Sequence, residues 1–570
     1  MALEGDPSPY QAAPVLDALV DVHARAGEWP EAADYALRAT DVVNQTDNLI
    51  AGRSARDRQL VRFEDLFRSA AYALAMSGRG ADAVSILERG RARASAETID
   101  VAGSAEERHR RHQLRQLEAK TRRRALLREP DYEDAIQVLR ESETESLIEG
   151  LLRRKATATR TEHAESTEDA ATGWADAVLP AVPVVNVLTT SEGSLAIVLH
   201  REAVDDPVSV DVLRLEGLRG QDLADLMSIG EGKGWKPDGS DAITATLQSV
   251  GPRVSAPIAS RLRSISVDSV VLILSGLLKA IPLHAAPYDG TGTSPHCLLD
   301  DFVVSYAASL DQLSVVRARV QRVVGGGRTP KRRQFLVVGN PLPHPLPLPL
   351  AETEARMVAT TMRRAGFGKV RLLTGQAATR DKVVRSLARS TWIHLACHGV
   401  REPGEPLSRR LEFADRGSID AADILSAWLF KDTRLVVMAG CETASSSAEV
   451  MSDEAIGLPT SMIQGGATGV VGALWPVLEL PTLLLMSRFY RILAGGGAAG
   501  SPDMSPASAL RAAQLWLRDL TAADIATTLS GIHPGHPDLD RLMSIAHTWP
   551  NVRPHQGNLH HWAPYLLVGV

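Results

Sequence analysis

Two apolar runs in the C-terminal third of the chain decide the fold. They read Trp392-Ile393-His394-Leu395-Ala396-Cys397-His398-Gly399 and Leu435-Val436-Val437-Met438-Ala439-Gly440-Cys441-Glu442. Each has the length of a buried strand and ends near a glycine. Because ligands collect at the carboxyl ends of strands in a parallel sheet, the imidazole of His398 and the thiol of Cys441 are predicted to share one crevice.

Apolar runs and amphipathic helical segments alternate around these two strands. This alternation predicts an α/β layer architecture with a mostly parallel sheet covered on both faces. The expected helices span 351–365 and 380–389. The expected strands span 182–188, 195–200, 208–215, 270–274, 335–338, 370–373, 392–396, 435–439 and 469–473.

The region from about 11 to 160 is rich in Ala, Leu, Arg and Glu at helical spacing. Two stretches share a pattern in which a helix ends at a glycine, Gly27 or Gly78, and a second helix starts near an acid. This pattern predicts helical hairpins of the tetratricopeptide (TPR) type. An irregular helical bundle stays open as the alternative, because the two glycines are 51 residues apart, which is longer than the usual repeat.

Highly charged helices are expected over 108–128 and 132–155, followed by a polar linker over 156–172. We therefore expect a domain boundary near 160–178.

Composition narrows the function classes. A net charge of -6 with interleaved acids and bases disfavours direct binding of nucleic acid. Three scattered cysteines among 570 residues fit a reducing, cytoplasmic compartment rather than a disulfide framework. The first ten residues lack a signal-peptide pattern, and no apolar run reaches roughly 18 residues, so neither secretion nor membrane insertion is expected.

A thiol and an imidazole at neighbouring strand ends have the chemistry of a cysteine peptidase. The thiolate attacks, the imidazole transfers protons, and backbone N–H groups hold the developing oxyanion. By itself this pair is a weak signal, since buried cysteines are usually inert. The surrounding motifs strengthen it.

Over about 240 residues, the order and spacing of these motifs resemble the CHAT family of caspase-like peptidases. The resemblance is carried by 348–351 with Glu354, and by 375–379, 393–399, 435–443, 453–458, 465–467, 474–477, 489–490 and 561–565. Two upstream segments, 276–283 and 298–310, also resemble the region that precedes the catalytic core in this family.

The resemblance implies a multidomain chain: an all-α, TPR-like domain over 1–165, a degenerate caspase-like α/β subdomain over 166–325, as in the related separases, and a catalytic caspase-like (CHAT) domain over 326–570. It implies cysteine endopeptidase activity without a metal or an organic cofactor. His398 would be the base and Cys441 the nucleophile, with the N–H groups of Gly399 and Cys441 as oxyanion donors.

The sequence departs from the family pattern near the site. Ala439-Gly440 stands where Ser-Ala is usual, Ala444 where Gly is usual, and Glu479 where Asp is frequent. Arg409-Arg410 lies in the segment between the two dyad residues.

Other polar residues near the dyad keep alternative interpretations. Asp453 and Glu454 either face a pocket for a substrate Lys or Arg, or cap a helix. His394 and Cys397 are expected to pack in the core. The histidines at 533, 536, 555, 560 and 561 lack the spacing of a zinc motif, so no metal site is predicted.

Two functions remain. The first is a regulated cysteine endopeptidase that cleaves a specific protein after an activating protein or ribonucleoprotein binds the helical domain, in bacterial antiviral defence or cell death. The second is a catalytically silent TPR/caspase-like adaptor. Retention of His398, Gly399 and Cys441 at strand ends favours the first.

Overall fold

The computed structural model describes residues 9–47, 53–100, 174, 177–228, 240–289, 296–324, 334–400, 410–421, 423–424, 429–440, 458–495, 505–532, 537–556 and 558–570. The charged helices and the polar linker expected between 108 and 172 lie outside these residues. Within the described part of the chain, no helix is both long enough and apolar enough to cross a membrane.

Two helical hairpins form the N-terminal region. Gly27 and Gly78 follow the first helix of each hairpin with φ of 77° and 83°, a backbone conformation that residues with a side chain disfavour. The predicted turns at these glycines are therefore confirmed. The helices are α1 (Pro9–Ala26), α2 (Trp29–Asp47), α3 (Arg53–Met76) and α4 (Gly80–Asp100).

Eleven strands of the described residues form one sheet, in the order β3-β2-β1-β4-β5-β14-β13-β12-β8-β6-β7. Its pairs are parallel except β1–β2, β2–β3 and β13–β14, so the expectation of a mostly parallel sheet is confirmed. The strands are β1 (Val184–Thr189), β2 (Ser194–His200), β3 (Ser209–Leu215), β4 (Ser269–Leu274), β5 (Val303–Tyr306), β6 (Gln334–Pro341), β7 (Lys369–Gly375), β8 (Trp392–Ala396), β12 (Leu435–Met438), β13 (Gly469–Ala473) and β14 (Tyr565–Gly569).

A second, three-stranded sheet lies beyond the end of β8, in the order β11-β10-β9. Its strands are β9 (Gly399–Val400), β10 (Arg410–Glu412) and β11 (Ser418–Asp420).

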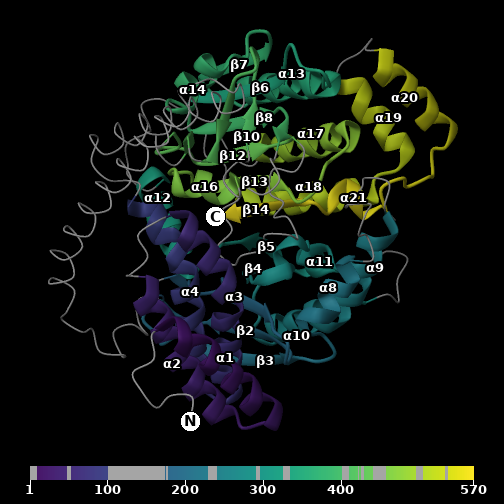
Figure 1. Ribbon diagram of the computed structural model, residues 1–570. Helices are drawn as coiled ribbons and strands as arrows, with labels where there is room; N and C mark the ends of the chain where they lie inside the picture. Colours follow the sequence, from purple (N-terminus) through teal and green to yellow (C-terminus); the bar gives the residue numbers. More distant parts are fainter. Residues whose placement is uncertain are drawn as a thin grey trace, which may run out of the picture.

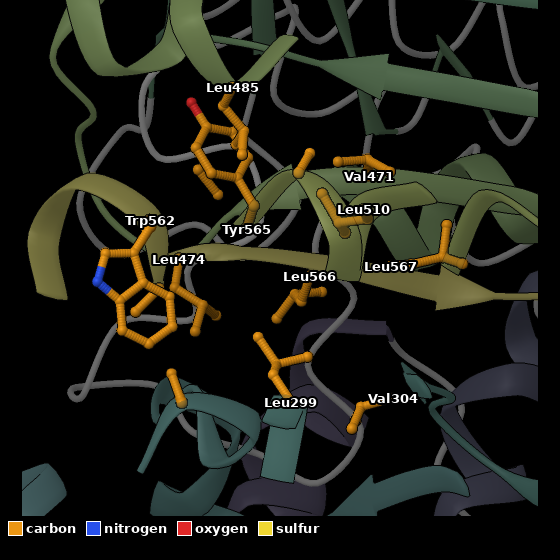
Figure 2. Packing of buried hydrophobic residues seen from close by; sticks show 14 of the residues in the cluster. Leu299, Val304, Val471, Leu474, Leu485, Leu510, Trp562, Tyr565, Leu566 and Leu567 are labelled. Carbon is orange, nitrogen blue, oxygen red and sulfur yellow. The ribbon is translucent and has the colours of Figure 1, made fainter. Parts of the chain in front are cut away.

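Strand β14 joins the two halves of the large sheet. It runs antiparallel to β13 and parallel to β5, so a strand from near residue 570 lies in the middle of the sheet (Figure 1). Leu566 and Leu567 lie among apolar side chains of both halves, including Leu299 and Val471 (Figure 2). Full burial of a Leu side chain stabilises a fold by roughly 1.5–3 kcal/mol. The sequence analysis missed β5 and β14, because β5 is only four residues long and a short apolar run fits a helix or a strand equally well.

Helices cover both faces of the sheet. One face is continuous across both halves and packs against the helices α8 (Gly220–Ser228), α9 (Ser240–Val250), α10 (Ala256–Ser264), α13 (Pro349–Arg364), α17 (Glu479–Gly495), α18 (Pro506–Asp519), α19 (Ala522–Ile532), α20 (Pro537–Thr548) and α21 (Leu559–Trp562). The other face packs against the hairpins on its N-terminal half. On its C-terminal half it packs against α14 (Arg380–Leu387) and α16 (Leu458–Gln464).

Helix α12 (Leu310–Val324) connects these two clusters. Leu310 and Leu313 pack with the hairpins, whereas Val316, one turn further along, packs with α14 and α16.

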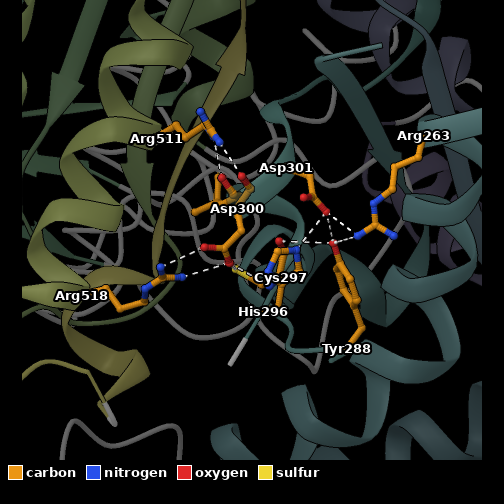
Figure 3. A network of polar contacts seen from close by, with 9 residues as sticks. Arg263, Tyr288, His296, Cys297, Asp300, Asp301, Arg511 and Arg518 are labelled. Carbon is orange, nitrogen blue, oxygen red and sulfur yellow. Dashed lines mark hydrogen bonds and ion pairs between the residues drawn. The ribbon is translucent and has the colours of Figure 1, made fainter. Parts of the chain in front are cut away.

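Polar contacts reinforce the junction between the halves. The guanidinium of Arg518 in α18 forms two hydrogen bonds, of 2.9 and 3.0 Å, to the carboxylate of Asp300, which belongs to the short helix α11 (Leu298–Asp301) (Figure 3). Arg511, also in α18, donates to the Asp300 carbonyl oxygen at 2.7 Å. Two arginines with fixed partners therefore hold α18 against the other half.

Candidate active site

Strands β8 and β12 bring the two predicted dyad segments together. They are adjacent and parallel, and Leu395 pairs with Met438 at their carboxyl ends. The ladder continues one step further, because the Ala439 N–H donates to the Leu395 carbonyl oxygen at 2.9 Å. A Cβ atom on Gly440 would overlap the Cys397 carbonyl oxygen. Glycine at this position, a departure from the family pattern, therefore allows the two strand ends to approach closely.

His398 stands two residues beyond β8 and is half-buried. Its Nε2 atom lies 2.6 Å from the carbonyl oxygen of Leu346. A carbonyl oxygen only accepts hydrogen bonds, so Nε2 carries the proton and Nδ1 is left as the base. Burial lowers the pKa of His398 below its usual value, although the contact with Leu346 opposes this effect. A lowered pKa favours the neutral ring, which is the form that a general base requires.

The predicted nucleophile Cys441 and the predicted pocket residues Asp453 and Glu454 lie outside the described residues. The other two cysteines are fully enclosed. Burial raises the pKa of Cys397 to about 12 and also raises that of Cys297. A buried thiol with a raised pKa does not form the thiolate needed for attack, which agrees with the expected core role of Cys397.

Gly399, the other predicted oxyanion donor, is the first residue of β9 and pairs with Leu411 of β10. Directly after the strand end, the Glu412 N–H donates to the His398 carbonyl oxygen at 2.9 Å. The small sheet therefore fixes the backbone on which His398 and Gly399 stand.

A loop after β6 supplies two groups that the sequence analysis missed, the side chain of His344 and the carbonyl oxygen of Leu346. The rings of His344 and His398 stack with centroids 3.9 Å apart. Strand β6 neighbours β8 in the sheet, so its carboxyl end lies at the same edge. The rule that led to His398 could have found this loop, had the strand order been known.

Both ends of this loop are anchored. The Asn340 side chain accepts a hydrogen bond from the Leu348 N–H at 2.8 Å. The Glu479 carboxylate accepts from the Leu350 and Ala351 N–H groups at 2.8 and 3.2 Å, so it caps the start of α13. Glu479, another departure from the family pattern, thus links the start of α17 to the loop that carries His344.

His394 lies deep in the core, as expected. Its Nε2 is 3.0 Å from a Glu354 carboxylate oxygen, and its Nδ1 is 3.1 Å from the Tyr490 hydroxyl. Glu354 belongs to α13 and Tyr490 to α17, and all three side chains are buried. Burial raises the pKa of Glu354. This cluster therefore braces β8 rather than facing a substrate.

The C-terminal histidines form a separate buried group. His555 and His561 face each other through their Nδ1 atoms at 2.7 Å. No group of three or more His, Cys, Asp or Glu in the described part of the chain could hold a metal ion. His533 and His536 lie outside that part.

Known proteins resemble this chain in sequence and in fold. A human protein, Tetratricopeptide repeat protein 28, is 26% identical over an alignment of 272 residues, and the match covers 40% of this chain and 10% of that protein. Two crystal structures of the separase–securin complex of Saccharomyces cerevisiae have similar folds. One has a TM-score of 0.51 at 8% identity, over 99% of this chain and 40% of that chain. The other has a TM-score of 0.50 at 9% identity, over 95% and 37%.

The chain thus spans less than half the length of each of these proteins, and identities of 8–9% carry the fold alone. The sequence also matches the model of the CHAT domain over residues 244–570, which are 327 of the 570 residues. This chain therefore belongs to the CHAT domain family, with a helical N-terminal region followed by a mixed-sheet, caspase-like region.

Proposed function

We propose that this chain is a regulated cysteine endopeptidase in which His398 and Cys441 form a catalytic dyad. Two observations carry the proposal: Leu395 pairs in register with Met438, and Nε2 of His398 donates its proton to a backbone carbonyl. Because β8 and β12 are adjacent and parallel, the proposal puts His398 and Cys441 at the same edge of the sheet. The unprotonated Nδ1 is then the atom available to the thiol.

In this mechanism Nδ1 of His398 takes the proton of the Cys441 thiol, and the thiolate attacks the scissile carbonyl carbon. The N–H groups of Gly399 and Cys441 stabilise the oxyanion. The imidazolium then protonates the leaving amine. Water hydrolyses the resulting thioester, which releases the carboxylate product and regenerates the thiol.

Asp453 and Glu454 form the specificity pocket in this proposal. Two carboxylates next to the nucleophile would select a basic residue before the cut, because Lys and Arg pair with carboxylates. A probe set with Arg, Lys, Ala and Asp at that position tests the selection. We expect Arg or Lys to be preferred, with the preference reduced in Asp453→Asn or Glu454→Gln.

Regulation enters through the helical hairpins, which would bind an activating protein or ribonucleoprotein. The Glu88 carboxylate on α4 accepts from the Leu310 N–H at 2.7 Å and so caps α12. Arg319, further along α12, donates to the Ile463 carbonyl oxygen of α16 at 2.6 Å. Because α16 begins at Leu458, soon after the predicted pocket residues, these contacts support a route from the hairpins to the site.

The biological setting follows the family resemblance: antiviral defence or programmed cell death in the cytoplasm, with a protein as the substrate. The yeast separase structures are complexes with securin, which agrees with a caspase-like chain controlled by a protein partner.

The dyad can be tested without a known substrate, because the chain has only three cysteines and the other two are buried. Alkylation of Cys441 by iodoacetamide is followed by peptide mass spectrometry as a function of pH. We expect a midpoint well below the value of about 8.5 for a free thiol, and a shift toward that value in His398→Ala. An unchanged midpoint in His398→Ala would contradict the dyad.

The reactivity of the site is tested with a peptidyl electrophile that alkylates active thiolates and leaves a stable thioether. Wild-type protein should be labelled, whereas Cys441→Ala and His398→Ala should not. Equal labelling of all three proteins would support the catalytically silent adaptor instead.

A further inference from the structure

We infer that His344 and Glu412 are positioning residues that hold the His398 imidazole in its working orientation. The inference rests on the proposed function, since it extends the dyad to a second histidine and a carboxylate. It is carried by the placement of three segments, the loop after β6, the loop after β8 and strand β10, which meet around one imidazole ring.

The first contact is the stack between the two rings. Their centroids are 3.9 Å apart and their planes differ by 19°. A parallel ring at this distance covers one face of His398 and prevents its imidazole from tilting toward that side. The side chain of His344 is 19% exposed, so the surrounding atoms hold it in turn.

The second contact acts on the Leu346 peptide. The Leu346 N–H donates a hydrogen bond to Nδ1 of His344 at 3.0 Å. The carbonyl oxygen of Leu346 receives the proton of His398 Nε2. His344 therefore holds the backbone of the residue that selects the tautomer of His398, in addition to covering its ring.

Glu412 contacts both histidines. Its carboxylate is 3.0 Å from Nε2 of His344, and a carboxylate accepts this hydrogen bond, so Nε2 carries the proton. In the neutral ring, Nδ1 is then the acceptor for the Leu346 N–H. The backbone N–H of Glu412 donates to the His398 carbonyl oxygen at 2.9 Å. One residue thus holds His398 by its backbone and His344 by its side chain.

The charged groups around His398 make the arrangement measurable. His344 lowers the pKa of His398 and Glu412 raises it, beside the larger effect of burial. Nε of Arg410, on the same strand as Glu412, lies 3.4 Å from the Glu412 carboxylate. Removing His344 takes away the ring that covers His398 and lowers its pKa, so the pKa of His398 should rise. Removing the charge of Glu412 should lower it.

The test uses the full chain labelled with ¹³C at the Cε1 atoms of its 16 histidines. The His398 signal is assigned by its loss in His398→Gln and titrated by NMR in wild type, His344→Ala and Glu412→Gln. We expect the midpoint to rise in His344→Ala and to fall in Glu412→Gln. The pair His23 and Glu28, 2.7 Å apart on the first hairpin, supplies matched controls, and His23→Ala and Glu28→Gln should leave the midpoint unchanged.

Labelling by the peptidyl electrophile gives the second readout. A misplaced base lowers the maximal labelling rate constant, and we expect a loss on the order of 10- to 100-fold in His344→Ala and Glu412→Gln with little change in the half-saturating probe concentration. Unchanged titration and labelling in both variants, or shifts of the midpoint in one direction, would overturn the inference. Glu412→Gln is nearly isosteric, so it keeps the test valid if His344→Ala folds poorly.

Failure of the inference and failure of the proposed function are distinguishable. The NMR titration needs neither a nucleophile nor a substrate. If His398→Ala leaves Cys441 alkylation unchanged, the dyad is wrong, while the response of His398 to its two neighbours is still read directly.

Discussion

Strands β4 and β8 belong to the same sheet, but different elements cover their carboxyl ends. Beyond β4, the guanidinium of Arg91 donates to the Ser275 hydroxyl at 2.9 Å and to the Asn186 side chain at 2.7 Å. Arg91 comes from α4, is 4% exposed and is paired with Glu88. Beyond β8, no helix of the hairpins intervenes among the described residues, and His398 is half-buried against a backbone carbonyl.

The sheet places residues at the ends of its strands. The difference shows that the elements packed against a strand end determine whether it is structural or accessible. Beyond β4, a buried ion pair attaches the hairpins to the sheet, so this strand end binds another part of the chain. At β8 a loop and a small sheet orient one imidazole. A parallel strand end is therefore a place for chemistry only where its neighbours leave a polar group accessible.

The largest expected effect comes from breaking the ion pair at β4. Arg91→Met leaves the Glu88 carboxylate buried without its partner and should cost about 3–5 kcal/mol of stability. Denaturant unfolding followed by circular dichroism measures the loss. Arg89→Met, on the same helix as Arg91, removes an exposed contact to Asp41 of α2 and should cost less than about 1 kcal/mol. Equal losses of stability in the two variants would show that the Arg91–Glu88 pair does not hold the hairpins at β4.

A smaller effect is expected after the loop that follows β6, where Glu479 caps the start of α13. Glu479→Ala should cost about 0.5–2 kcal/mol, because two N–H groups at the start of the helix lose their acceptor. Glu352→Ala is the matched control, since it removes only an exposed i,i+4 pair with Arg356 in the same helix. The same unfolding assay applies. A loss in Glu352→Ala as large as that in Glu479→Ala would argue against the cap.

A further expected effect is a pH dependence at the C-terminal histidines. Burial lowers the pKa of His555 and of His561 to about 4, from about 6.5 in an unfolded chain. The unfolded chain therefore binds more protons between these values, and stability falls as the pH drops from 6.5 toward 4.

Hydrogen exchange at pH 7 and pH 5 should locate this loss at α21 rather than in the hairpins. In His561→Gln the difference between the two pH values should be smaller. If acid opens the hairpins first, or if the variant keeps the full pH difference, these histidines are not the cause.

Local patterns predicted much of the fold. The apolar run before His398 and the run before Cys441 were recognisable as buried strands, and Gly27 and Gly78 were recognisable as helix ends. These features depend on neighbours in the chain. The family pattern also singled out Glu479 as a departure, although its contact with the start of α13 required the structure.

Contacts between distant segments could not be predicted. The position of β14 depends on its pairing with β5, which lies about 260 residues earlier in the chain. His344 acquires its place only when β6 pairs with β8. Arg91 sits in a charged helix, where an ordinary pattern predicts a solvated side chain, yet it is buried because Asn186 and Ser275 satisfy its donors.

The place of β14 also bears on how the protein is made. On the ribosome, a chain folds progressively from its N-terminal side at roughly 5–20 residues per second. Strands β5 and β13 are both finished well before Tyr565–Gly569 emerges, so neither half of the sheet has its central neighbour until β14 has been made. The strand ends around His398 therefore gain their final support only after residue 569 has been added.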